Sequence, residues 1–219
     1  MKEIEARFLE IDIEDMRKKL KALKAKKVHP MMVYRRYIFT LQNPAEKGYA
    51  RVRQEASGIT MTIKKYGANK YASEFEVALD NTTLEEARDF MLGAGFTQKA
   101  YHETMREKYK LPTVNEIVID VIPGLPPYVE IEAPSEAKMI AICEKLGLSM
   151  ENAKYGAYGK QFEEYYGIPQ TVADNDVAEM KFETIDKHLK KHIKKNKALL
   201  AKVKKSNLAI YKKVVKGRK

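Results

Sequence analysis

Charged residues of one sign recur at every second position in several short segments of the chain, with apolar residues between them. Arg51 and Arg53 flank Val52, for example, and Glu130 precedes Glu132 by two positions. Side chains two positions apart on a β-strand point to the same face, so each segment would carry one charged and one apolar face. Such strand-like segments cover residues 2–10, 34–41, 48–55, 59–66, 71–79, 103–111, 115–122 and 128–133.

Eight strands of this length suit a closed antiparallel sheet. Three amphipathic helices are also predicted, and each needs an apolar surface to cover. The apolar strand faces are the obvious surface, which would leave the charged faces inside. We therefore predict an α+β fold, a closed eight-stranded antiparallel β-barrel with helices packed outside. The predicted helices are residues 13–26 after Asp12, residues 84–94 after a capping box that begins at Thr83, and residues 136–146 between Ser135 and Gly147.

A charged barrel interior needs compensation, because burying ions without partners costs several kcal/mol for each ion. Water, paired charges, metal ions or an anionic ligand could supply it. Carboxylates suit Mg²⁺ or Mn²⁺, and arginine and lysine suit phosphate oxygens, so a triphosphate with a divalent cation fits this pattern. The alternative is that the polar strand faces point to water and form a surface network of salt bridges.

The basic charge is concentrated at one end of the chain. Residues 170–219 contain 15 Lys and Arg but 5 Asp and Glu, a net charge of +10, whereas the whole chain carries +11. We therefore predict two parts, residues 1–169 and residues 170–219, with a boundary after Pro169. An apolar stripe from Phe182 to Val214 predicts one long basic helix in the second part. That helix could pack on the barrel, form a homodimer with a second copy, or contact polyanions or an acidic membrane surface without specificity.

Few other features restrict the function. The single cysteine, Cys143, falls on an apolar helical pattern and is expected to be a small core residue. The chain has no apolar run long enough for a transmembrane segment and no secretory signal at its start, so we expect a cytoplasmic protein without a membrane span.

The charged segments resemble, in order, those of the CYTH proteins within the triphosphate tunnel metalloenzymes. The opening Glu3-Ile4-Glu5-Ala6-Arg7 is similar to the Glu-x-Glu-x-Lys signature of the family, with Arg in place of Lys. The resemblance spans about residues 1–168. Its further motifs are Ala50-Arg51-Val52-Arg53, Thr60-Met61-Thr62-Ile63-Lys64, Glu74-Phe75-Glu76, Arg106-Glu107-Lys108, Val118-Ile119-Asp120 and Tyr128-Val129-Glu130-Ile131-Glu132.

The resemblance implies three sets of site residues. Only one of the adjacent Arg35 and Arg36 can face inward, and we choose Arg36. The implied metal ligands, for Mg²⁺ or Mn²⁺, are Glu3, Glu5, Asp120, Glu130 and Glu132. The implied substrate-binding residues are Arg7, Arg36, Arg51, Arg53, Lys64, Arg106, Lys108 and Lys160. The residues to which we assign catalytic roles are Glu5, Glu76, Glu130 and Lys64.

The family includes inorganic and thiamine triphosphatases and class IV adenylyl cyclases, so the resemblance implies an enzyme acting on a triphosphate. We favour hydrolysis of inorganic triphosphate or of an organic or nucleoside triphosphate, because it requires no contacts specific to a nucleoside. Cyclisation of ATP to cyclic AMP and pyrophosphate is the first alternative. A binding module for polyphosphate or nucleotide, without turnover, is the second.

Overall fold

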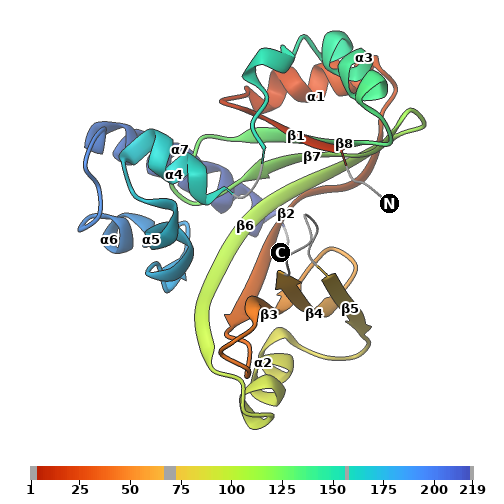
Figure 1. The fold of residues 1–219 in the computed structure, drawn as a ribbon. Helices are drawn as coiled ribbons and strands as arrows, with labels where there is room; N and C mark the ends of the chain where they lie inside the picture. The colour runs from red at the N-terminus through yellow and green to blue at the C-terminus, as the bar shows by residue number, and fades with distance from the viewer. Residues whose placement is uncertain (1–3, 67–72, 156–157, 218–219) are drawn as a thin grey trace.

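One curved sheet organises the protein. The computed structural model describes residues 4–66, 73–155 and 158–217 (Figure 1). The strands follow the order β1-β8-β7-β6-β2-β3-β4-β5, and all of these neighbours are antiparallel. A short strand, β9, pairs with β6 in parallel. The strands are β1 (Ile4–Leu9), β2 (Lys26–Phe39), β3 (Lys47–Gln54), β4 (Ile59–Tyr66), β5 (Ser73–Leu79), β6 (Gln98–Leu111), β7 (Val114–Val121), β8 (Tyr128–Ala133) and β9 (Glu179–Met180).

The three helices predicted from caps and periodicity are present. Helix α1 (Ile13–Ala22) begins after Asp12, α2 (Leu84–Gly93) follows the Thr83 capping box, and α3 (Glu136–Leu146) ends at Gly147 in a left-handed conformation. Helix α1 ends at Ala22, before the predicted limit at residue 26, because Lys24 adopts a left-handed conformation and the chain then enters β2 at Lys26. The remaining helices are the 3-10 turn η1 (Met150–Asn152), α4 (Gly159–Tyr166), α5 (Gln170–Asn175), α6 (Ile185–Leu189) and α7 (Lys197–Lys216).

The predicted closed barrel is wrong, because the sheet is open between β1 and β5. The free edge of β1 is bridged by backbone hydrogen bonds between Arg7 and Lys154, at 2.9 and 2.8 Å, and not by β5. The long strands β2 and β6 bend past one another, with register shifts near His29 and Phe39. These strands carry the β3-β4-β5 end of the sheet away from the β1-β8-β7 end (Figure 1).

Helices cover the outer face of the sheet at both ends. Helix α2 packs on β2 to β4 over a cluster that includes Phe39 and Val52. A larger cluster that includes Leu20, Met105 and Met139 lies under α1, α3 and α7. Most apolar strand faces are therefore buried against helices as predicted, but the apolar side chains of β5 are not, because Phe75 and Val77 are exposed. The charged strand faces lie together on the opposite, concave side.

The second part of the chain is not the single helix predicted for residues 170–219. It forms α5, β9, α6 and then α7, a helix of 20 residues. Asn196 adopts a left-handed conformation before α7, and the backbone N–H groups of Lys194 and Lys195 donate to the Tyr166 carbonyl. These tertiary bonds replace helical ones, so the helix breaks although no proline or glycine marks the place. None of the described helices has the length and apolar character needed to cross a membrane.

Candidate functional site

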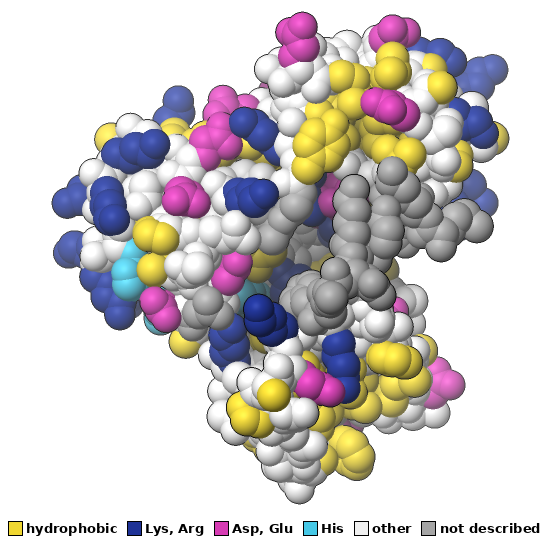
Figure 2. Space-filling model, in the orientation of Figure 1, with side chains coloured by type: hydrophobic (Ala, Val, Ile, Leu, Met, Phe, Trp, Pro, Cys, Tyr) yellow, Lys and Arg dark blue, Asp and Glu magenta, His cyan; other side chains and the backbone are white. Residues whose placement is uncertain are grey.

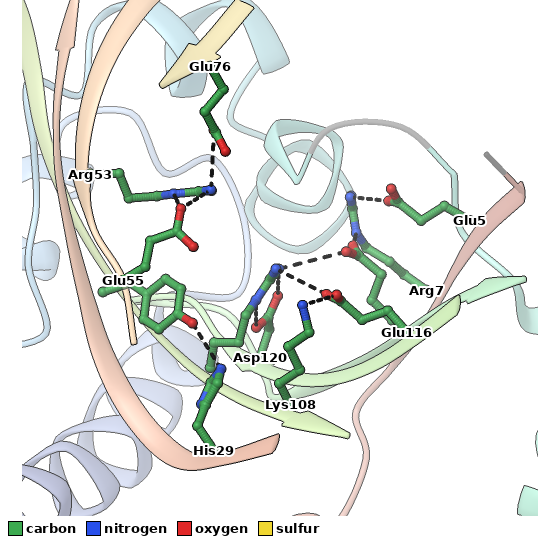
Figure 3. A network of polar contacts seen from close by, with 12 residues as sticks. Glu5, Arg7, His29, Arg53, Glu55, Glu76, Lys108, Glu116 and Asp120 are labelled. Atoms are coloured by element: carbon green, nitrogen blue, oxygen red, sulfur yellow. Dashed lines mark hydrogen bonds and ion pairs between the residues drawn. The ribbon is translucent and has the colours of Figure 1, made fainter. Parts of the chain in front are cut away.

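The charged side chains of the strands meet on the concave face of the sheet. Figure 3 shows side chains from β1, β3, β5, β6 and β7 directed toward one common space. The β2-β3-β4 end supplies mainly cations, and the β1-β8-β7 end supplies mainly carboxylates. We call these ends the basic half, with Arg36, Arg51, Arg53 and Lys64, and the acidic half, with Glu5, Glu116, Asp120, Glu130 and Glu132.

Two arginines of the basic half are direct cross-strand neighbours. Arg36 of β2 lies opposite Arg53 of β3, and Arg51 follows two positions before Arg53 on the same face. Burial and repulsion from Arg51 lower the pKa of Arg53, although an ion pair with Glu55 opposes this shift. Like charges directly opposite one another destabilise a sheet. The arrangement therefore favours an anion between these side chains.

Arg36 has the fewest partners of these cations. Its Nε is buried without a hydrogen-bond acceptor, and no carboxylate of the described residues pairs with it. Its Nη2 lies 3.4 Å from the Tyr158 hydroxyl, which contacts His102 Nδ1 at 3.2 Å. His102 in turn contacts the Val177 carbonyl at 3.4 Å, and burial, aided by Arg36, lowers the pKa of His102 to about 3. The neutral ring thus donates to Val177 and accepts from Tyr158, and this chain of contacts holds Arg36 in place.

Two glutamates of β5 form ion pairs with the other basic side chains. Glu74 lies 3.0 Å from Lys64 and 3.3 Å from Arg51, and Glu76 lies 3.4 Å from Arg51. Partial burial opposes ionisation of Glu76, but a hydrogen bond from Thr62 and the nearby arginines outweigh it and lower its pKa. Both glutamates are more than a third exposed, so exchanging them for another anion costs little desolvation.

A row of three carboxylates crosses the acidic half. Glu132 of β8 lies opposite Glu5 of β1 on one side and opposite Glu116 of β7 on the other. Lys108 pairs with Glu116, Asn115 donates to Glu132 at 2.9 Å, and Glu5 turns to Arg7 at 2.6 Å. Carboxylates aligned across three strands repel one another, and their oxygen atoms are the donors that Mg²⁺ and Mn²⁺ prefer.

Glu130 lies next to this row, between two arginines. Arg7 pairs with it directly, and Arg106 lies 3.7 Å away while donating two hydrogen bonds to Asp120 at 2.8 and 2.6 Å. Burial raises the pKa of Glu130 to about 7, and the neighbouring arginines lower it less than burial raises it. Across residues 4–66, 73–155 and 158–217, no three His, Cys, Asp or Glu side chains converge as a metal site requires. The carboxylate oxygens of the acidic half are suitable ligands for a hard cation such as Mg²⁺. In this structure, however, Arg7 and Arg106 form ion pairs with Glu130 and Asp120.

The concave face contains most of the residues predicted from the sequence. Arg36 lies on this face, whereas Arg35 lies on the outer face, 3.8 Å from Glu103. Glu3 falls outside the described residues. Lys160 is exposed on α4 and makes no ion pair with any described residue. The residues that the structure brings together are Glu5, Arg7, Arg36, Arg51, Arg53, Lys64, Glu76, Arg106, Lys108, Asp120, Glu130 and Glu132.

The residues assigned from the sequence omit Glu116 of the acidic half, and sequence reasoning missed three further residues of the site. Glu55 neutralises Arg53, and its two-residue spacing from Arg53 was a signal that could have been used. Tyr158 and His102 support Arg36 from elements more than 55 positions apart along the chain. No local pattern marks that contact, because it depends on how α4 lies against the sheet.

Comparison with known proteins places this arrangement in a family. No curated protein matches the chain. The PH1012 protein from Pyrococcus horikoshii OT3 is 23% identical, with a TM-score of 0.55 over 72% of this chain and 97% of that chain. A conserved hypothetical protein from Pyrococcus furiosus is 22% identical, with a TM-score of 0.56 over 72% and 98%. A protein from Vibrio parahaemolyticus, described as a proposed adenylate cyclase, is 11% identical, with a TM-score of 0.57 over 72% and 95%.

These likenesses establish the fold alone. The CYTH domain family matches residues 1–156, which include every strand from β1 to β8 and all of the clustered site residues. The charged segments of the strands, their order and the concave face that they form agree with this match, and the chain belongs to the CYTH domain family.

Proposed function

We propose that this protein hydrolyses a triphosphate with the help of a divalent cation. The observation that carries the proposal is the opposition of Arg36 and Arg53 across β2 and β3, with the Arg36 Nε buried and without an acceptor among the residues that the structure describes. An arginine guanidinium in this state is suited to bidentate binding of phosphate oxygens. The adjacent Arg51 and Lys64 extend the cationic surface, as a ligand with several phosphate groups requires.

The two halves of the site have different tasks in this proposal. Phosphate oxygens replace Glu74 and Glu76 as partners of Arg51 and Lys64, at little cost because both glutamates are partly exposed. Arg7, Arg106 and Lys108 hold oxygens at the end of the ligand that approaches the acidic half. Lys160 of α4 is retained as a further candidate for this role. The carboxylates that would hold the cation are Glu5, Glu130 and Glu132, with Asp120 and Glu3 as additional donors.

Phosphoryl transfer requires positioning and charge neutralisation more than covalent chemistry from the protein. A bound cation neutralises phosphate oxygens and makes water a better nucleophile at neutral pH. Lys64 neutralises charge that develops on the phosphate, and Glu76 has a lowered pKa and is ionised at neutral pH. Its carboxylate can therefore accept a proton from the water that attacks the terminal phosphorus in line.

The test measures products from inorganic triphosphate and from ATP, with Mg²⁺, with Mn²⁺ and with chelator. We expect metal-dependent release of phosphate. Arg53→Ala should lower kcat/KM at least about tenfold, because a charge-assisted hydrogen bond contributes about 1.5–3 kcal/mol. Arg88→Ala, on the outer surface of α2, removes the same charge and should leave kcat/KM unchanged. Equal rates for the Arg53→Ala and unmodified proteins would contradict the proposal.

The same assay separates the alternatives. Cyclisation of ATP releases pyrophosphate and forms cyclic AMP, whereas hydrolysis releases phosphate from the terminal position. Formation of cyclic AMP would show that the protein is a cyclase and would contradict the proposal of hydrolysis. Binding of triphosphate without formation of either product would indicate a binding module. The same set of arginines is also compatible with that function.

A further inference from the structure

Five exposed lysines lie along one side of α7 and form what we call the lysine stripe: Lys202, Lys205, Lys212, Lys213 and Lys216. With about 3.6 residues per turn, all five fall within roughly a third of the helix circumference. Lys202 and Lys216 are separated by about 21 Å along the helix axis, at about 1.5 Å per residue. The stripe is therefore a line of positive charge on one helix.

The five lysines of the stripe have no direct ion-pair partner within the described part of the chain. Helix α7 itself contains no acidic residue. Lys204, which lies outside the stripe, instead pairs with Asp186 at 2.5 Å. On the concave face, by contrast, Arg51, Arg53 and Lys64 each have a carboxylate partner. The stripe thus differs from the basic half, whose cations are largely paired.

The stripe is held rigidly on the outer side of the sheet. The opposite side of α7 packs Leu208, Tyr211 and Val214 against the core under β2 and β6. Asn207, which is 1% exposed, donates 3.0 Å hydrogen bonds to the Ile122 and Leu125 carbonyls. The lysines therefore face away from the concave site, and a ligand on them is separate from the ligand between Arg36 and Arg53. Figure 2 shows further Lys and Arg side chains over the segment that joins α6 to α7, at the left of the view.

Acidic residues border the stripe on the side of α1. Two cavities of about 390 and 520 Å³ lie between α7 and the start of α1. Lys202 and Lys213 line the α7 side of these cavities, and Glu10, Asp12 and Glu14 line the other side. A duplex nucleic acid centred on the stripe would bring its second strand over these carboxylates. A single chain of phosphates can follow the lysines without crossing them.

Single-stranded nucleic acid and membranes fit the stripe less well. Proteins bind single-stranded nucleic acid by stacking bases on aromatic side chains, and the nearest aromatic residue on α7, Tyr211, is already stacked on Phe182. Insertion into a membrane needs exposed large apolar side chains. All the exposed large apolar side chains of the described residues lie before residue 170, so α7 has none. Lysine is a compact point charge that suits phosphate and reads no base.

We propose that the lysine stripe binds a single-chain polyanion made of phosphate groups, namely long-chain inorganic polyphosphate. This site is additional to the triphosphate site and does not depend on turnover there. Each bound lysine releases counterions from the polyanion, so binding should weaken steeply as salt rises.

The experiment measures binding of labelled long-chain polyphosphate to the full chain in chelator, over a range of salt concentrations. The stripe variant carries Lys205→Gln, Lys212→Gln and Lys216→Gln. The matched control carries Lys18→Gln, Lys138→Gln and Lys145→Gln, three exposed lysines of α1 and α3 without ion pairs to described residues. We expect the stripe variant to bind at least about tenfold more weakly and its salt slope to decrease by about 2, while the control stays within about twofold.

Equal losses in the two variants would overturn the proposal, because they would show a dependence on net charge alone. Tighter binding of duplex RNA, or of vesicles containing anionic lipid, than of polyphosphate would also overturn it. Arg53→Ala distinguishes this site from the triphosphate site, since it should leave polyphosphate binding by the stripe intact. If the unmodified protein does not bind polyphosphate through the stripe but turns over triphosphate, this inference alone is refuted. If it binds polyphosphate through the stripe but does not turn over triphosphate, the proposed function alone is refuted.

Discussion

Arg36 and Arg53 lie directly opposite one another on the concave face, and within the described part of the chain only Arg53 of the two has a carboxylate partner. The protein holds two positive charges together at a cost to its own stability, and Tyr158 and His102 keep Arg36 in position. A negatively charged ligand that binds between the two arginines would relieve their repulsion. In the proposed function, these prearranged charges favour binding of an anion at the basic half.

Replacing Arg36 with methionine removes both the repulsion between Arg36 and Arg53 and a donor to the phosphate. We expect Arg36→Met to raise the free energy of unfolding of the ligand-free protein by up to about 1 kcal/mol and to weaken triphosphate binding at least about tenfold. Urea unfolding and titration calorimetry measure the two quantities. Arg35→Met is the matched control on the outer face: it leaves the buried Glu103 without its arginine, so it should destabilise the protein without changing binding. Unchanged triphosphate affinity in Arg36→Met would contradict the assignment.

The row formed by Glu5, Glu132 and Glu116 predicts a metal-dependent effect. Glu132→Gln keeps the size of the side chain but removes the central charge of the row. We expect Mn²⁺ binding to weaken by about tenfold or more and metal-dependent turnover to fall with it, while the metal-free protein becomes no less stable. Calorimetric titration with Mn²⁺ measures the affinity. Glu144→Gln, at an exposed position of α3, should have no effect, and equal Mn²⁺ affinity in both variants would remove Glu132 from the site.

Buried His102 makes stability depend on pH. Its pKa is lowered to about 3 in the folded protein, compared with about 6.5 in the unfolded chain, so the unfolded state binds more protons between these values. This group alone should therefore lower the free energy of unfolding by on the order of 3 kcal/mol as the pH falls from 7 to 4. Urea unfolding at several pH values measures the slope. His102→Gln, which cannot titrate, should show a shallower decrease, and parallel curves for the two proteins would contradict this account.

The hydrogen bonds of Asn207 should contribute to the free energy with which α7 docks on the rest of the protein. Asn207→Ala leaves the Ile122 and Leu125 carbonyls without their donor, which should cost about 1–3 kcal/mol for each buried group that no water reaches. Thermal or urea unfolding measures the loss, and hydrogen exchange should become faster around residues 122–127. Ser206→Ala, at the exposed neighbouring position, should change stability by less than about 0.5 kcal/mol. Equal stability of the two variants would show that α7 docks by other contacts.

Much of the site could be predicted because strand periodicity is a local property. Alternation of apolar and charged residues correctly places Arg51 with Arg53 and Glu130 with Glu132 on one face. Helix ends at Asp12, Thr83 and Ser135 were equally readable, since a cap involves residues only three positions apart.

The sequence by itself determined which side chains share a face, where three helices begin, and which family the charged motifs resemble. The tertiary structure alone decided the rest, because those features depend on residues far apart in the chain. It placed Arg36 opposite Arg53, aligned Glu5 with Glu132 and Glu116, and left the sheet open by giving the edge of β1 to Lys154. It also broke the predicted basic helix before α7, where bonds to the Tyr166 carbonyl outweigh the local helical pattern.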